Sequence, residues 1–171
     1  MKDRIILASQ SPRRKQLLEL INLEFDIAVS TVPETTRASL SPVQYAKEMS
    51  RRKARQIASQ KSNVLVIGAD TVVVHEDEIL EKPTDMADAR RMLTRLSNTS
   101  HSVITGVSLI SSNQNQQSTQ SLTFHEITEV VFGQLTDKEI NEYVETGGPM
   151  DKAGSYGIQD DWGALFVKKI I

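Results

Sequence analysis

The sequence predicts one α/β domain in which short apolar strands alternate with helices that begin at well-defined caps. Strands are indicated by β-branched apolar runs such as residues 64–74, which are typical of strands buried on both faces. Helices are indicated by the Ser-Pro pairs at 11–12 and 41–42, because serine caps a helix and proline fits its first turn. A length of 171 residues, with 39% hydrophobic and 25% charged residues, suits a single globular domain.

The composition excludes several kinds of chemistry. The absence of cysteine rules out disulfides, thiolate metal sites and cysteine nucleophiles. The three histidines, His75, His101 and His125, do not have the spacing of a zinc site. The first apolar run is too short for a signal peptide, and no run approaches the roughly 20 apolar residues of a membrane span. We therefore expect a cytoplasmic protein.

Charge is unevenly distributed along the chain, although the net charge is only −2. The first 61 residues hold twelve basic and six acidic side chains, and the remainder holds eight basic and sixteen acidic ones. Such asymmetry fits a nucleic-acid surface. It fits equally well a group of cations around a small polyanionic ligand, faced by carboxylates that hold a metal.

The stretch 64–74 contains an acidic residue in apolar surroundings. Its letters predict two short strands that flank Gly68, Ala69, Asp70 and Thr71. A buried carboxylate costs several kcal/mol unless a cation or hydrogen-bond donors compensate it. Two interpretations stay open: Asp70 lies on a turn between strands, or it lies at a strand end, where it faces a cleft and holds a divalent metal or a water.

A predicted strand at 5–8 leads into a helix with an unusual first turn. Arg13, Arg14 and Lys15 stand there, where cations oppose the helix dipole. Free backbone N–H groups and arginine side chains at such a place suit a phosphate, and a solvated basic face is the alternative. The P-loop pattern is absent. We expect the buried face of this helix to be formed by Leu17, Leu18 and Ile21.

Two lysines have positions that suit contact with phosphate. Lys53 falls on the apolar stripe of a helix predicted from Ser41 to about Ser59, where it either lies at the rim of the core or reaches a ligand. Lys82 precedes Pro83, which keeps its backbone extended and outside any helix. Glu34, in a polar loop, is by itself a plain loop acid.

The other elements follow from periodicity and caps. Thr84 or Asp85 caps a helix with the stripe Met86, Ala89, Leu93 and Leu96. A capping box opens another helix at Thr136. The remaining predictions are a strand at 25–29, strands at 101–111 and 122–135 joined by a polar hairpin tip, and a helix end at 147–149.

The last stretch, 151–171, is rich in glycine and polar groups. Gly154, Gly157 and Gly163 allow a close approach of the backbone to a ligand, and they are equally compatible with an ordinary loop before an edge strand. A neutral side chain such as Gln159 suits reading of the polar edge of a base. With the basic residues and carboxylates above, this inventory fits hydrolysis of a nucleoside triphosphate better than acyl or redox chemistry, since no catalytic triad or dinucleotide fingerprint is present.

Five segments closely resemble the Maf family of nucleotide pyrophosphatases, also called septum formation proteins. They are LASQSPRRKQLLE, GADTVV, EKP, ITGVSL and DKAGSYGIQ, in the family's order. The resemblance implies an inosine-triphosphatase-like α/β fold with a mixed, twisted sheet, flanking helices and two lobes around a cleft. It also implies cleavage of a nucleoside triphosphate to the monophosphate and pyrophosphate. The chain then forms a single Maf-like domain over 1–171 that is expected to lack the family's usual C-terminal segment.

The resemblance also assigns roles to individual residues. Arg14, Thr71 and Gln159 match the branch that acts on dTTP and UTP, rather than the branch for 7-methyl-GTP. Asp70 matches the proton acceptor, and a Mg²⁺ or Mn²⁺ ion is expected on Asp70 and Glu34. The positions expected to bind substrate are Ser9, Arg13, Arg14, Lys53, Thr71, Lys82 and Gln159.

Two other classes of function remain open at this point. A non-catalytic nucleotide-binding regulator of cell division is suggested by the family's septum name. A nucleic-acid-binding module fits the basic first third, but the chain has only 5% aromatic residues and no known nucleic-acid motif. We expect a nucleoside triphosphate as partner, no nucleic acid and no membrane, with a homodimer left open.

Overall fold

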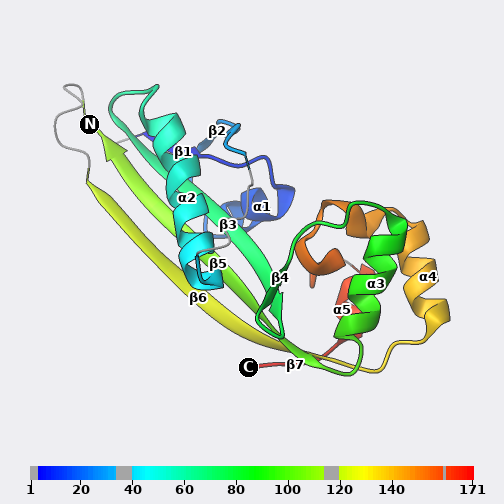
Figure 1. Cartoon of the computed structure of the whole chain (residues 1–171). Helices are drawn as coiled ribbons and strands as arrows, with labels where there is room; N and C mark the ends of the chain where they lie inside the picture. The colour runs from blue at the N-terminus through cyan, green and yellow to red at the C-terminus, as the bar shows by residue number, and fades with distance from the viewer. Residues whose placement is uncertain (1–3, 34–39, 114–119, 160) are drawn as a thin grey trace. The chain divides into compact units, whose positions relative to one another are not determined.

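The computed structural model describes residues 4–33, 40–113, 120–159 and 161–171 and shows a mixed α/β fold (Figure 1). Glu34 lies outside the described residues. The predicted mixed sheet with flanking helices is confirmed. In chain order the elements are β1 (Arg4–Leu7), α1 (Pro12–Leu20), β2 (Asp26–Ile27), α2 (Pro42–Ala58), β3 (Val64–His75), β4 (Glu78–Leu80), α3 (Met86–Leu96), β5 (Ser100–Ser112), β6 (Ser121–Phe132), α4 (Asp137–Glu145), two short 3₁₀ helices (Gly148–Asp151 and Ala153–Ser155), α5 (Asp161–Phe166) and β7 (Val167–Ile170).

The sheet has the strand order β2-β1-β3-β5-β6-β7, with β4 paired to β3 beside this path. Strand β1 is parallel to both β2 and β3, whereas β3–β4 and β6–β7 are antiparallel pairs. The β3–β4 hairpin turns at Glu76 and Asp77, which both have a positive φ as a type I′ turn requires. None of the helices within the described ranges is long and apolar enough to cross a bilayer.

The chain divides into two compact units. Unit 1 comprises Met1–Asp70 and Thr105–Glu126, and unit 2 comprises Thr71–Ile104 and Ile127–Ile171. The boundary in β3 falls between Asp70 and Thr71. The cleft between two lobes and the inosine-triphosphatase-like likeness, both expected from the resemblance, stay predictions.

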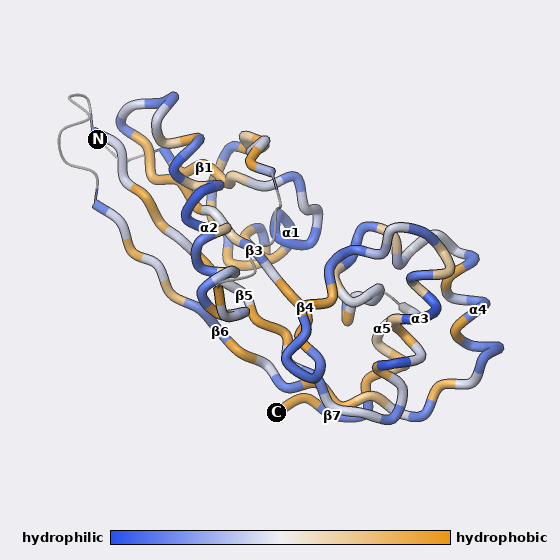
Figure 2. Tube along the Cα trace, viewed as in Figure 1, coloured by the Kyte–Doolittle hydropathy of each residue, from blue (hydrophilic) through white to orange (hydrophobic). Residues whose placement is uncertain are grey.

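Helix α2 packs closely on the strands of unit 1 because glycines face it. A Cβ on Gly68 of β3 would lie 2.3 Å from the carbonyl oxygen of Ser50, and one on Gly106 of β5 would lie 2.3 Å from that of Ala46. Figure 1 shows α2 running along these strands. Figure 2 shows hydrophobic residues among the hydrophilic ones along α2. The buried side of α2 is mostly hydrophobic and also contains Ser50 and Lys53. The core here includes Ile6, Ala54, Ile57, Val66 and Ile110.

The core of unit 2 is formed by α3, α4 and the ends of the long strands. Leu93, Phe132, Tyr143 and Val144 are almost fully buried in it. Helix α3 begins at Asp85, whose side chain accepts a hydrogen bond from the backbone N–H of Asp88. Helix α4 begins with the predicted capping box at Thr136.

Four sequence predictions about these elements are wrong in detail. Residues 64–74 do not form two strands around a turn, because β3 runs unbroken through them. Helix α1 buries none of its residues, and Leu17 and Ile21 are 52% and 67% exposed, because its apolar residues form no single stripe. In α3 the buried stripe contains Met92, whereas Met86 is exposed. The strand predicted at 25–29 is shorter, and β2 contains two residues.

Candidate active site

Asp70 lies within a continuous strand and is paired with Lys53 of α2. The Nζ atom of Lys53 donates a hydrogen bond of 2.6 Å to Oδ1 of Asp70, and each side chain is 10% exposed. Successive residues of a strand point to opposite faces, so Asp70 points to the same face as Gly68, which α2 covers. The close approach at Gly68 thus explains how a helix residue reaches a buried strand carboxylate. Asp70 therefore lies neither on a turn nor at a strand end.

The pair solves the problem that a carboxylate poses in apolar surroundings. Removing a charge from water costs several kcal/mol, which a cation at hydrogen-bonding distance offsets in part. Lys53 is therefore buried with its ammonium group on a carboxylate, and its contact with a ligand stays a prediction. The ammonium group has three donors, of which Asp70 Oδ1 takes one.

The basic start of α1 is organised around Ser9. Arg14 Nη1 donates to Ser9 Oγ at 3.1 Å, and the backbone N–H of Ser11 donates to the same oxygen at 3.2 Å. Ser11 is the N-cap, as predicted, but its side chain makes no capping hydrogen bond among the described residues. Ser9 is buried, while Arg13 and Arg14 are half-buried. The turn before α1 is thus ordered by a serine that the resemblance places in the site.

The register of the sheet brings this turn and Asp70 to similar positions along two neighbouring parallel strands of unit 1. Leu7 at the end of β1 pairs with Ile67 of the parallel strand β3, and the N–H of Ala8 donates to the carbonyl oxygen of Ile67. Ser9 is two residues beyond Leu7 in the chain, and Asp70 is three residues beyond Ile67. The predicted residues that unit 1 contains are Ser9, Arg13, Arg14, Lys53 and Asp70.

Unit 2 contains the other three described candidates, Thr71, Lys82 and Gln159. Thr71 is half-buried, and Lys82 and Gln159 are exposed. The segments EKP and DKAGSYGIQ meet in this unit, because the N–H of Gly154 donates to the carbonyl oxygen of Glu81 at 3.1 Å. Gly154 has a φ of +67°, and a Cβ there would lie 2.9 Å from the side chain of Val73. Glycine at 154 therefore has a packing role against β3, which the sequence alone could not separate from a ligand-binding role.

The residue pair that the sequence predictions missed is His101 and Tyr156. The His101 Nε2 atom and the Tyr156 hydroxyl are joined by a hydrogen bond of 2.6 Å, and both residues are buried. Burial lowers the pKa of His101 to about 4, and His75 adds to this shift. Burial also raises the pKa of the Tyr156 hydroxyl well above its usual value. His101 begins the segment HSVITGVSL. The spacing of the histidines was relevant only to a zinc site and does not indicate that a histidine pairs with a distant tyrosine.

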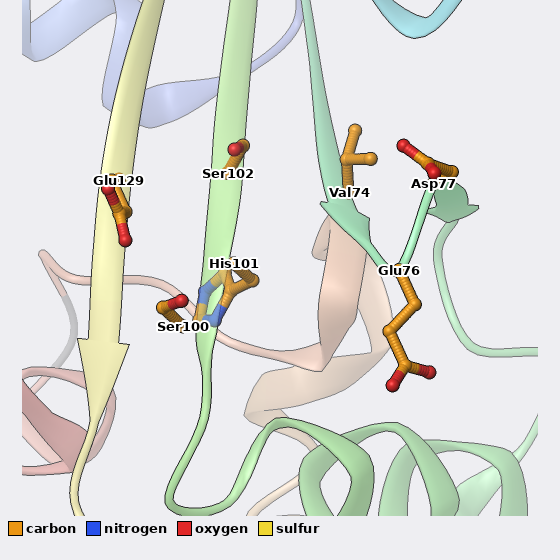
Figure 3. A pocket seen from close by; sticks show the side chains of 7 residues that line it. All are labelled: Val74, Glu76, Asp77, Ser100, His101, Ser102 and Glu129. Atoms are coloured by element: carbon orange, nitrogen blue, oxygen red, sulfur yellow. The ribbon is translucent and has the colours of Figure 1, made fainter.

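Unit 2 also has an open, acidic surface hollow beside this histidine (Figure 3). Figure 3 shows the side chains of Glu76, Asp77 and Glu129 around it, with His101 on β5. None of the described candidate residues lines this hollow. The complete lining is Val74, Glu76, Asp77, Ser100, His101, Ser102 and Glu129.

Among the described side chains, Asp70 is the carboxylate that could bind a divalent cation. Among the described residues no group of three or more His, Asp or Glu side chains lies together as a metal site would require. Mg²⁺, however, is usually held by one or two carboxylates together with substrate phosphates and waters. Asp70 fits as such a carboxylate ligand.

Fold and geometry together define an α/β protein with a buried lysine–aspartate pair on β3 and an arginine-rich turn after the neighbouring strand β1, an arrangement suited to a polyanionic ligand. The chain belongs to the Maf family, since the family model described as "Maf-like protein" matches residues 4–171. It is 48% identical over 166 residues to a protein of Salinibacter ruber named dTTP/UTP pyrophosphatase, covering 97% of this chain and 79% of that protein. It is 47% identical over 167 residues to a Bacillus cytotoxicus protein of the same name, covering 98% of this chain and 84% of that protein. A solved structure of the Staphylococcus aureus Ham1 protein is similar with a TM-score of 0.48 and 17% identity, covering 75% of this chain and 72% of that one.

Proposed function

We propose that this protein is a nucleotide pyrophosphatase that hydrolyses dTTP and UTP to the nucleoside monophosphate and pyrophosphate. The observation that carries the proposal is the identity of 47–48%, over nearly the whole chain, with relatives named dTTP/UTP pyrophosphatase. The proposal is supported by the buried Lys53–Asp70 pair, which would supply a carboxylate as base, and by the Ser9 turn, which carries Arg14 as a cation for phosphate. The activity would remove these triphosphates, or modified pyrimidine forms of them, from the cytoplasmic nucleotide pool.

Asp70 is the proposed proton acceptor. The oxygen of a water molecule attacks the α-phosphorus, the bond from that phosphorus to the bridging oxygen of the β-phosphate breaks, and pyrophosphate leaves. The proton of the water passes to Asp70 and then to solvent. Lys53 holds the carboxylate in one position. Its positive charge would also stabilise the negative charge that develops on the phosphate oxygens.

A carboxylate with an ordinary pKa near ~3.9 is a weak base at neutral pH, so metal assistance is part of the proposal. Asp70 would hold a Mg²⁺ or Mn²⁺ ion, with Glu34 as a second proposed ligand. When bound, such an ion neutralises phosphate charge and makes a water more acidic. Asp70 would in that arrangement contact both the ion and Lys53.

Substrate binding is assigned to the remaining candidates. Arg13, Arg14 and Lys82 would neutralise the triphosphate, with Ser9 ordering the turn that carries the arginines. Gln159 would read the polar edge of the pyrimidine, and Thr71 would contribute to substrate choice. These partners are free nucleotides, not nucleic acid or a membrane surface, and homodimer formation stays a prediction.

The experiment that tests the proposal is pyrophosphate release from dTTP and UTP by the purified chain, with and without Mg²⁺. We expect release from both nucleotides that requires the cation, with much slower release from ATP and 7-methyl-GTP. Binding of dTTP without release would instead support the regulator of cell division. Faster turnover of 7-methyl-GTP than of dTTP would contradict the substrate assignment while leaving the reaction class intact.

A further inference from the structure

We propose that His101 is a positioning residue: through Tyr156 it fixes the loop that presents Gln159. The reading of a pyrimidine by Gln159 rests on the proposed function, whereas the fixing of the loop rests on the contacts described next. His101 touches no substrate in this proposal. It acts on substrate affinity through the loop.

The two residues form a tight buried group with Phe132. Their hydrogen bond measures 2.6 Å, and His101 and Tyr156 are only 4% and 7% exposed. The ring of Phe132 lies edge-on to both, with centroid distances of 4.9 Å to His101 and 4.7 Å to Tyr156. The Tyr156 ring is therefore held by packing, and its hydroxyl is held by a directed bond to β5. Packing with this geometry restricts the ring more than apolar burial alone does.

Tyr156 is the last buried side chain before Gln159. Upstream of it, the N–H of Gly154 is bonded to Glu81, and the buried Ser155 Oγ donates to the Met92 sulfur at 3.2 Å. Downstream, Gly157 is half-buried, whereas Ile158 is 40% exposed and Gln159 is exposed. The segment therefore passes from core to surface within three residues, and the Tyr156 hydroxyl bond is its final side-chain anchor among the described residues.

Histidine suits this position because its Nε2 atom gives the buried Tyr156 hydroxyl a hydrogen-bond partner. Without it, that hydroxyl would be buried with its hydrogen bond unmade. The ring is neutral at physiological pH, so it brings no charge into the core. Its Nδ1 has no hydrogen-bond partner among the described residues, which leaves Nε2 as the atom that anchors it. A glutamine side chain can place an amide group near the same point, whereas a leucine cannot.

Three variants test the proposal: Tyr156→Phe, His101→Leu and His101→Gln, with the exposed His125→Gln as the matched control. We expect Tyr156→Phe and His101→Leu to raise the KM for dTTP about tenfold with kcat changed by less than about twofold, as the loss of one buried hydrogen bond predicts. His101→Gln should restore the KM to within about threefold of wild type. The double variant His101→Leu/Tyr156→Phe should be no worse than the poorer single variant, since neither partner is then left unpaired.

A second readout does not depend on activity. Amide hydrogen exchange at residues 157–159 should become at least about tenfold faster in Tyr156→Phe, which keeps the packed ring, and should stay at the wild-type rate in His101→Gln. If the wild-type chain turns over neither dTTP nor UTP, the proposed function fails, but this exchange result still decides whether His101 positions the loop. Unchanged exchange and unchanged KM in Tyr156→Phe would overturn the proposal, as would a fall in kcat at constant KM. If His101→Leu does not fold, Tyr156→Phe decides alone.

Discussion

The Nζ atom of Lys53 lies 2.6 Å from Oδ1 of Asp70, and this contact joins helix α2 to the middle of strand β3 in the core of unit 1. An ion pair with side chains only 10% exposed is uncommon, because both charges lose most of their hydration. The pair should therefore affect both the free energy of unfolding and the proposed hydrolysis. Mutations can measure these two effects separately.

Breaking this pair from either side should destabilise the protein. We expect Asp70→Asn and Lys53→Met each to lower the free energy of unfolding by about 3–5 kcal/mol, because each leaves one buried charge without its counter-ion. The double variant Lys53→Met/Asp70→Asn should recover part of that loss. Urea unfolding of the four proteins in a double-mutant cycle measures the coupling.

The control for this cycle is the exposed pair of Arg4 and Asp26, whose side chains are 69% and 49% exposed. Asp26→Asn should leave the urea midpoint close to that of wild type, because solvent screens such a pair. Strict additivity of the Lys53 and Asp70 variants would contradict a direct buried interaction.

Gly68 should be intolerant of even one added methyl group. A Cβ there would lie 2.3 Å from the Ser50 carbonyl oxygen and 2.8 Å from the Ala54 side chain, so Gly68→Ala must push α2 away from β3. We expect a loss of several kcal/mol in the free energy of unfolding and slower turnover, because Lys53 moves with α2. The matched variant Gly133→Ala meets only an atom at 3.9 Å and should be nearly neutral. Similar thermal midpoints for the two variants would rule out this role of Gly68.

The sequence was sufficient to predict most elements near the site, because their signals are local. The Ser-Pro helix start at Ser41, the capping box at Thr136 and the stripe that places Lys53 inward all depend on residues within a few positions of one another. The charge of Asp70 within an apolar run was enough to indicate that this residue is unusual. The resemblance assigns Asp70 to the site, and the structure shows its carboxylate buried and paired with Lys53. Its catalytic role stays a prediction.

Two of the errors concern contacts between distant segments. The letters Gly-Ala-Asp suit a turn, and only the approach of α2 shows that Gly68 serves helix packing within an unbroken strand. The pairing of His101 with Tyr156 joins residues 55 positions apart, which no periodicity records. The exposed face of α1 was missed for a local reason: a few apolar residues suggest a buried face, although the apolar residues of this helix form no single stripe.

Stability should fall on acidification through His101. Its pKa is lowered from 6.5 to about 4 in the folded protein, so the unfolded chain takes up the proton first. This contribution is fully favourable above pH 6.5 and is lost as the pH falls toward 4, by at most about 3 kcal/mol. The groups near the ring are His75, Tyr156 and the carboxylates of the acidic hollow, Glu76, Asp77 and Glu129.

Urea unfolding at a series of pH values between 7 and 4 checks this prediction. His101→Gln cannot take up the proton and should show a smaller loss across that range than wild type. The same slope in both proteins would show that other groups cause the acid sensitivity.

Gln159→Glu should weaken recognition of the base more than binding of phosphate. A carboxylate cannot donate the hydrogen bonds that an amide donates, and it repels the triphosphate only weakly from an exposed position. We expect kcat/KM for dTTP and UTP to fall by about 10–100-fold, while inhibition by pyrophosphate changes little. A nucleotide panel with inhibition constants for pyrophosphate makes the comparison. An equal loss for all nucleotides and for pyrophosphate would argue against base reading by Gln159.

The most direct test of the account is pyrophosphate release from dTTP in Mg²⁺ by wild type and by Asp70→Asn, under conditions where circular dichroism shows both to be folded. The account predicts turnover by wild type and a loss of at least about 10³-fold in kcat for the variant, because the proposed proton acceptor is gone. Turnover by folded Asp70→Asn at the wild-type rate would contradict it.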